Sequence, residues 1–384
     1  MQRFVSTLRS ALGAAATTEG HSAATGAQEE VGGVLYDLPL SHPQTVSLDD
    51  CDGCAARDTC LQPDAHEAYP SYLKLDREAI LYGKMKPLMR HVVVSTGAPA
   101  RYWPSNVEKA TLEEATKAAQ IAGGESAQPV AEGAADEADT TGALWDARAI
   151  TVTGMLSRAA KAEGAGKWLA CTAQRQPAGE VFLFPEYQML SLFDADTVAA
   201  MRSEDKTVEG ADPYDPARIE ARVQQFVRQV AQSTAPTKRA DADDTPETRV
   251  DLPPSLPLRP IPYRAVILIC AHQRRDKRCG IAGPILHRRF LEALEQRRQR
   301  DAATAGDATD ATTATACDDV GVFMVSHTGG HKFAGNVLIY PAGVWYGRVT
   351  ACHVDAILER TVFGQEIIRE LYRGRLNPPT STDF

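Results

Sequence analysis

The sequence predicts an α/β protein in which two similar units follow one another along a chain of 384 residues. Three observations predict this fold class. Each half of the chain has a short run of β-branched residues followed by a segment typical of a helix. Each half also has an apolar strand that ends at a proline, which cannot donate to the hydrogen-bond ladder of a sheet. A polar, proline-rich stretch at 232–258 separates the halves and predicts a linker.

The first half begins with a predicted strand at 90–97, where a β-branched run ends at a glycine. A helix is predicted at about 104–121, and an apolar strand at 181–185 ends at its proline. A closing helix is predicted at about 215–231. The first strand ends in Ser95-Thr-Gly and carries no cysteine, so this half predicts a degenerate unit without a metal site.

The second half repeats this pattern with more apolar strands. Strands are predicted at 263–270, 320–325 and 337–341, and helices at about 282–299 and 353–373. Strand, helix, strand, strand, helix is the order of a thioredoxin-like α/β unit. The sequence therefore predicts two thioredoxin-like units in tandem, of which the N-terminal one is degenerate.

Composition changes along the chain predict the domain limits. Two low-complexity stretches, 122–143 and 301–316, lack the apolar periodicity of packed elements and predict an insertion and a loop. The predicted parts are a terminal segment at 1–30, the degenerate unit at 31–231, the linker at 232–258 and the second unit at 259–384.

Charge and hydropathy exclude two classes of protein. The formal net charge is −9, which argues against nucleic-acid binding, because such proteins present a positive field to the phosphates. No apolar run approaches the roughly 18–20 residues that span a bilayer. The eight cysteines are too sparse for a disulfide scaffold in so long a chain, and their clustering favours metal or redox chemistry.

Two pairs of metal-competent side chains lie in the second half. Cys270 ends one predicted strand and is followed by Cys279, while His327 and His331 follow the strand at 320–325. Sites in open α/β sheets gather at the carboxyl ends of strands, where both loops begin. The two glycines between the histidines let the backbone turn tightly and approach a bulky ligand.

The residues alone leave three functions open. Two cysteines and two histidines suit an electron carrier, but they are also a tetrahedral zinc set, so a zinc-stabilised binding module is an alternative. In the first half Cys51, Cys54 and Cys60 could bind zinc, form a redox disulfide or do neither. A thiol–disulfide redox quality-control factor using Cys51 and Cys54 is therefore the other alternative, although this pair precedes the first predicted strand instead of following it.

Residues 263–360 resemble thioredoxin-like [2Fe–2S] ferredoxins, with histidines at 327 and 331 where those proteins have cysteines. The run Ser-His-Thr-Gly-Gly-His-Lys-Phe-Ala-Gly-Asn at 326–336 resembles the sucrase/ferredoxin-like family, which includes the actin-patches-distal and altered-inheritance-of-mitochondria proteins. Cys51-Asp-Gly-Cys54, Arg90-His-Val-Val-Val94 and Trp103-Pro104 fit the same pattern, and the resemblance covers about 48–375.

The resemblance implies a [2Fe–2S] cluster on Cys270, Cys279, His327 and His331, with the cysteines on one iron and the histidines on the other. It implies an electron carrier more than an enzyme with a substrate of its own. Replacing two thiolates by neutral imidazoles makes reduction easier, as in Rieske centres at about −150 to +300 mV against about −400 mV for all-cysteine ferredoxins. Electron uptake is expected to be coupled to proton uptake at the imidazoles.

Other features near the pairs have supporting roles in this interpretation. His272 is predicted to hydrogen-bond to a ligand residue instead of binding metal itself. Lys332 either offsets cluster charge, helps to dock an unidentified redox partner protein, or is simply solvated.

The first residues are arginine-containing and acid-poor with one apolar face, which is typical of a mitochondrial transit peptide or of a frayed terminus. A mitochondrial location is therefore favoured, and a cytoplasmic one stays open.

Overall fold

The computed structural model describes residues 34–35, 45–46, 69–85, 88–126, 140–192, 216–232, 258–304 and 319–376. The predicted terminal segment at 1–30 and the predicted N-terminal sites Cys51, Cys54 and Cys60 lie outside these residues.

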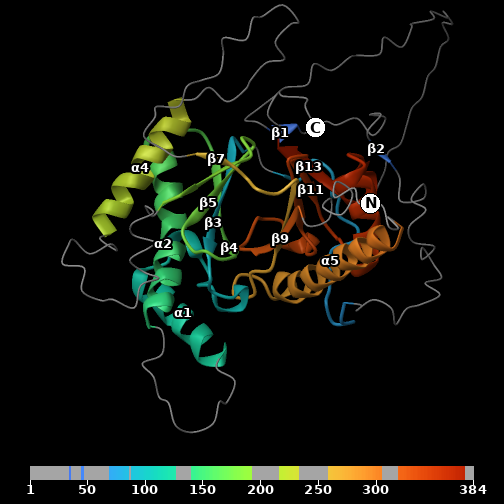
Figure 1. The fold of residues 1–384 in the computed structure, drawn as a ribbon, viewed down its shortest axis with the longest axis horizontal. Coiled ribbons are helices and arrows are strands. Elements are labelled where there is room, and N and C mark those ends of the chain that lie inside the picture. Colours follow the sequence, from blue (N-terminus) through green and yellow to red (C-terminus); the bar gives the residue numbers. More distant parts are fainter. Residues whose placement is uncertain are drawn as a thin grey trace, which may run out of the picture.

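The first half contributes strands and helices in an order close to the predicted one (Figure 1). The strands are β3 (Arg90–Thr96), β4 (Trp168–Gln174), β5 (Glu180–Phe184) and β6 (Gln188–Ser191). Strand β7 (Arg259–Pro260), which follows the predicted linker, pairs with β6. The helices are α1 (Leu112–Ser126), α2 (Thr140–Ala162) and α4 (Pro216–Gln232). The strands predicted at 90–97 and 181–185 and the helix predicted at 215–231 are thus confirmed to within two residues.

The second half is built on strands that are apolar throughout, because they are buried on both faces. These are β8 (Ala265–Cys270), β9 (Val320–Val325), β10 (Val337–Tyr340) and β11 (Val344–Tyr346). Helix α5 (Lys277–Thr304) follows β8. The chain then makes the short helix α6 (Val354–Ala356), a π-helix at Ile357–Phe363, and strands β12 (Ile367–Ile368) and β13 (Tyr372–Leu376).

Strands of both halves form one mixed sheet. Its order is β1-β13-β11-β10-β8-β9-β4-β3-β5-β6-β7, where β1 is Val34–Leu35. Strands β3 and β4 are parallel, as are β8 and β9, while β5 and β10 run antiparallel to β3 and β8. The halves meet where Ala173 of β4 pairs with Val325 of β9. A second, two-stranded sheet joins β12 to β2 (Thr45–Val46).

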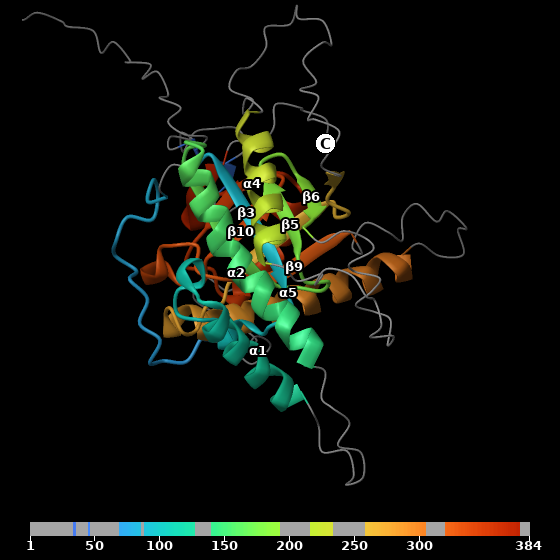
Figure 2. The same ribbon diagram turned by 90° about the vertical axis from the view of Figure 1, so that its left-hand side faces the viewer.

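The three largest buried cores among the described residues hold these layers together. Val92 and Val94 of β3 pack with α2 and α4 in one core, while α5 packs on the alternate residues of β8 in another. The third core lies between the two halves of the sheet and contains Val93 and Leu268. There the Phe184 ring stacks on Tyr340, with centroids 3.8 Å apart. Figures 1 and 2 show the helices on the outer sides of the strands.

The structure corrects several predicted elements. The helix predicted at 353–373 is wrong, since the helical part ends at Phe363 and the chain returns as β12 and β13. Helix α2 and strand β4 were not predicted. Both ends of the stretch 122–143 are helical, because its alanines and glutamates favour helix. The predicted division at 232–258 stays a prediction, since 233–257 lie outside the described residues.

Helix α5 begins five residues earlier than predicted. The Asp276 carboxylate accepts a hydrogen bond from the Arg278 backbone N–H at 2.9 Å, which is the interaction of an N-terminal cap. The helix consequently starts at Lys277 and includes Pro284, although proline is usual only in a first turn. This early start puts Cys279 in the first turn of a helix instead of a loop.

Within the described residues, no helix is long and apolar enough to cross a membrane.

Candidate metal centre

The sheet topology brings the two predicted ligand pairs together. Strands β8 and β9 are parallel neighbours, with Cys270 paired to Val325 at their carboxyl ends. Cys270 is therefore the last residue of β8, and His327 lies two residues beyond the end of β9. Cys279 reaches the same place from the first turn of α5.

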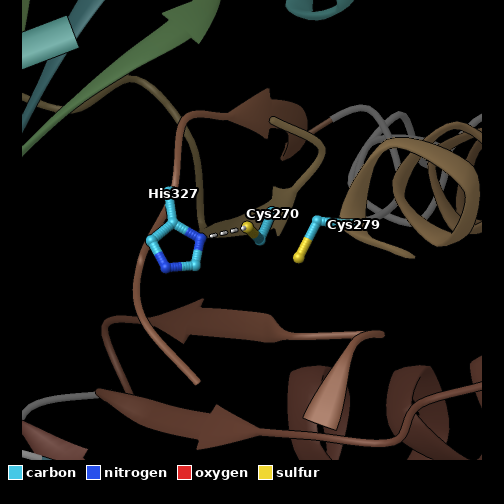
Figure 3. A group of neighbouring side chains, drawn as sticks. All are labelled: Cys270, Cys279 and His327. Carbon is cyan, nitrogen blue, oxygen red and sulfur yellow. Dashed lines mark hydrogen bonds between the residues drawn. The ribbon is translucent and has the colours of Figure 1, made fainter. Parts of the chain in front are cut away.

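Three of the four predicted donors form one compact group (Figure 3). The ligand atoms of Cys270, Cys279 and His327 all lie within 4.8 Å of one another. The Nδ1 atom of His327 is 3.9 Å from the Sγ atom of Cys270 and points toward it. Both cysteines are fully buried, and His327 is partly buried. No carboxylate belongs to this group among the described residues.

His331 lies beside this group but is not part of it. Its ring centroid is 5.5 Å from that of His327, and the two rings are tilted by 36°. His331 begins a single 3₁₀ turn and is exposed. The His331 ring thus lies next to the His327 ring and is more exposed to solvent.

The pKa values of the two thiols are shifted in opposite directions. Hydrogen bonds from Cys279 and from His327 lower the pKa of Cys270 well below its ordinary value. The pKa of Cys279 is raised by its hydrogen bond to Cys270 and by burial. The direction at Cys270 favours the thiolate, which is the form that binds metal.

His272 supports the histidine loop from behind. Its Nδ1 atom accepts a hydrogen bond from the His327 backbone N–H at 3.3 Å, and its Nε2 atom is 2.8 Å from the Pro104 carbonyl oxygen. Burial lowers the pKa of His272 to about 4, so the ring is neutral with its proton on Nε2. Both ring nitrogens are then occupied, as the predicted supporting role requires.

The N-terminal half forms a wall of the site. The Ser326 backbone N–H donates to the Thr172 carbonyl oxygen at 2.8 Å, and the Ser326 hydroxyl accepts from the Thr172 N–H at 3.0 Å. Together with the contact between Pro104 and His272, these bonds fix the start of the histidine loop to the first half of the chain. No sequence pattern pointed to this wall, because β4 was not predicted.

Asn336 and Arg373 hold the turn at Gly329 and Gly330. The sequence analysis assigned no role to either residue. The Asn336 side chain donates from Nδ2 to the Gly330 carbonyl oxygen at 3.2 Å. The Asn336 backbone carbonyl oxygen accepts from the Cys270 backbone N–H at 3.0 Å. Arg373 of β13 donates to the Asn336 side-chain oxygen at 2.6 Å and to the Gly329 carbonyl oxygen at 3.4 Å. Arg373 lies in the segment wrongly predicted as helix, so no sequence pattern pointed to it.

The basic residues near the site are partly neutralised. The ammonium of Lys332 is 3.5 Å from the carboxylate of Asp76, and both side chains are exposed. Arg278 forms an ion pair with Asp276 at 2.8 Å. An exposed pair such as that of Lys332 and Asp76 contributes little energy, and the roles proposed for Lys332 from sequence stay predictions.

Replacing Gly330 by alanine is expected to destabilise the fold more than replacing Gly329. Both glycines have positive φ, +90° at Gly329 and +71° at Gly330, so each alanine costs about 1–2 kcal/mol of backbone strain. A Cβ at Gly330 would also clash with the Arg373 guanidinium, whereas a Cβ at Gly329 meets nothing within 4 Å. Urea unfolding of the two variants measures the difference, and equal losses would contradict this packing.

The donor set fits an iron–sulfur cluster. Thiolate ligands select iron–sulfur clusters, zinc and copper(I), while imidazole suits iron and zinc. The group has two cysteines, of which Cys270 has a lowered pKa, one converging imidazole and a second imidazole beside it. The same donors fit zinc.

Comparisons with known proteins agree with the sequence pattern. Residues 81–374 match the protein family described as Sucrase/ferredoxin-like. Altered inheritance of mitochondria protein 32 of Clavispora lusitaniae is 37% identical over 139 residues, which are 35% of this chain and 44% of that protein. Actin patches distal protein 1 of Saccharomyces cerevisiae is 38% identical over 107 residues, which are 27% of this chain and 31% of that protein. The matched segments thus span less than half the length of these relatives.

A solved structure is also similar to part of the chain. The thioredoxin-like [2Fe-2S] ferredoxin from Aquifex aeolicus is 21% identical, and the match covers 31% of this chain and 96% of that protein with a TM-score of 0.22. A likeness at this TM-score does not establish a common cofactor.

Proposed function

The chain belongs to the sucrase/ferredoxin-like family, and from that premise we propose that it is an electron-transfer protein carrying a [2Fe–2S] cluster on Cys270, Cys279, His327 and His331. The observation that carries this proposal is the convergence of two buried thiols and an imidazole at the carboxyl ends of β8 and β9. His331 completes the set from the end of the same loop.

A bound cluster supplies a one-electron redox couple. The protein residues determine its charge and its access to solvent. Cys270 and Cys279 contribute the anionic ligands from inside the core, where water is excluded. Each imidazole binds through one nitrogen and holds a proton on the other, so electron uptake is coupled to proton uptake. The exposed ring of His331 is where this proton exchanges with water.

The purified protein is expected to contain iron and acid-labile sulfide in equal amounts and to absorb visible light. Elemental analysis and the visible spectrum of protein purified without oxygen measure this. Zinc in place of iron, in a colourless protein, would support the zinc-stabilised binding module instead, because the same donors suit Zn²⁺. The third alternative, thiol–disulfide chemistry, rests on Cys51 and Cys54, which lie outside the described residues.

The two halves are proposed to be tandem thioredoxin-like units, of which the first has no cluster. The strand pairing β4-β3-β5-β6 has the same order and directions as β9-β8-β10-β11, which supports this proposal. Thr96 is the last residue of β3 in the first unit, as Cys270 is the last residue of β8 in the second. Proposed limits are 31–231 and 259–384, joined at 232–258.

The redox partner is proposed to be a protein that donates or accepts one electron near the exposed His331. The relatives named altered inheritance of mitochondria protein support a mitochondrial location for this chain, with the cytoplasm as the alternative.

A further inference from the structure

Arg373 is a buried cation without a carboxylate partner in the described part of the chain. Its side chain is on β13, and the residue is 2% exposed. Its hydrogen bonds go to two neutral oxygens, those of Gly329 and Asn336, and its Nε atom is buried with no partner. Burying a charge is costly unless an anion compensates for it, so the site should contain such an anion.

The fold makes room for this guanidinium beside the histidine loop. A Cβ at Gly330 would clash with its terminal nitrogen, and a Cβ at Gly347 would approach its Cδ atom at 2.6 Å. The guanidinium also lies 5.6 Å from the centre of the Phe333 ring, whose face favours a cation. Two glycines and an aromatic ring thus accommodate Arg373 between the core and the candidate ligands.

The anions that act on Arg373 are the two candidate thiol ligands. Burial lowers its pKa to about 10, and the charges of Cys270 and Cys279 act in the opposite direction. The guanidinium therefore stays charged at neutral pH. Lys332 is a weaker source of positive charge for the same site, because it is exposed and paired with Asp76.

We propose that Arg373 is the fixed counter-charge of the metal centre, compensating the Cys270 and Cys279 thiolates and stabilising the reduced state. This inference rests on the proposed function. Reduction adds one electron from a one-electron donor protein, and at a pH where no proton accompanies the electron the centre becomes more negative by one charge. A fixed buried cation stabilises the more negative state more strongly, because charges interact with little screening in the protein interior. Arg373 thus raises the midpoint potential of the centre.

Two variants of Arg373 separate its charge from its hydrogen bonds. Arg373→Gln removes the charge but keeps a donor for Asn336, and Arg373→Lys keeps the charge with fewer donors. A redox titration is expected to give a lower midpoint potential for Arg373→Gln and a value near the wild type for Arg373→Lys. The matched control is Arg375→Gln on the same strand, whose charge acts on Tyr372 and Tyr346, and it should leave the potential unchanged. Equal shifts for the two Arg373 variants, or no shift for Arg373→Gln, would overturn the proposal.

A second measurement needs no cluster. In metal-free protein, a pH titration of the ultraviolet absorbance of thiolate is expected to give a higher thiol pKa in Arg373→Gln and not in Arg375→Gln. Absorbance is the suitable readout because Cys270 is fully buried and no reagent has to reach its sulfur. The thiolate fraction falls about tenfold for each unit by which the thiol pKa rises. An unchanged titration in Arg373→Gln would overturn the proposal, and Arg373→Met serves as the neutral variant if glutamine does not fold. A wild-type protein without iron or sulfide would defeat the proposed function alone, because the thiolate titration would still decide whether Arg373 compensates the thiolates.

Discussion

Replacing Cys270 by serine is expected to abolish the visible absorption of the purified protein and to remove its iron. Cys270 is the thiolate member of the buried pair, and a serine hydroxyl at this position stays protonated and binds iron poorly. Loss of a ligand should exceed the roughly 10–100-fold loss of metal affinity that follows mutation of a merely supporting residue. Iron analysis and the visible spectrum of the variant measure the effect, and Cys279→Ser should behave in the same way.

The control for this prediction is Cys352→Ser. Cys352 is a half-buried cysteine just before α6, outside the candidate group, so its variant should keep iron and colour. Circular dichroism of all three variants separates ligand loss from unfolding, because a buried serine without a hydrogen-bond partner itself costs about 1–3 kcal/mol. A Cys270→Ser protein that is folded and still coloured would exclude Cys270 as a ligand.

The second large effect is expected from replacing both histidines by cysteine. In the double variant His327→Cys, His331→Cys, two neutral ligands become anionic, so the reduced state is penalised. The midpoint potential should fall from the range of about −150 to +300 mV toward about −400 mV. Its dependence on pH should also disappear, since no imidazole remains to exchange a proton. Redox titrations from pH 5 to 9 on both proteins test the two statements together.

A histidine outside the site provides the matched control. His287 of α5 hydrogen-bonds to the Val322 backbone, and burial lowers its pKa, but it is not part of the candidate group. The variant His287→Gln should keep both the potential and its dependence on pH. If the double cysteine variant titrated at the potential of the wild type, the histidines would not be ligands.

The apolar strands were predictable because local pattern and burial agree in them. Strands β3, β8 and β9 contain runs of β-branched or aliphatic residues, and β3 and β8 stay buried along their whole length. Helix α2 was missed because much of its buried face is alanine, as at Ala147, Ala149 and Ala160, which gives a weak apolar period. Strand β13 reads Tyr-Arg-Gly-Arg-Leu, and Arg373 is buried by contacts that sequence does not show.

The site was predictable in its donors and not in its surroundings. Cys270 and His327 follow apolar strands, and parallel strands bring such positions to one edge of a sheet. The hydrogen bonds of His272 to Pro104 and of Ser326 to Thr172 join residues more than 150 positions apart. Arg373 approaches the thiols only because β13 pairs with β11. No local pattern encodes these contacts, since they depend on the tertiary arrangement.

The ligand set itself is best tested by pulsed electron paramagnetic resonance on reduced protein whose histidines carry nitrogen-15. Two histidine nitrogens bound to iron should give strong couplings that change with the isotope and vanish in the double cysteine variant. A reduced paramagnetic centre without any coupling to histidine nitrogen would contradict the account.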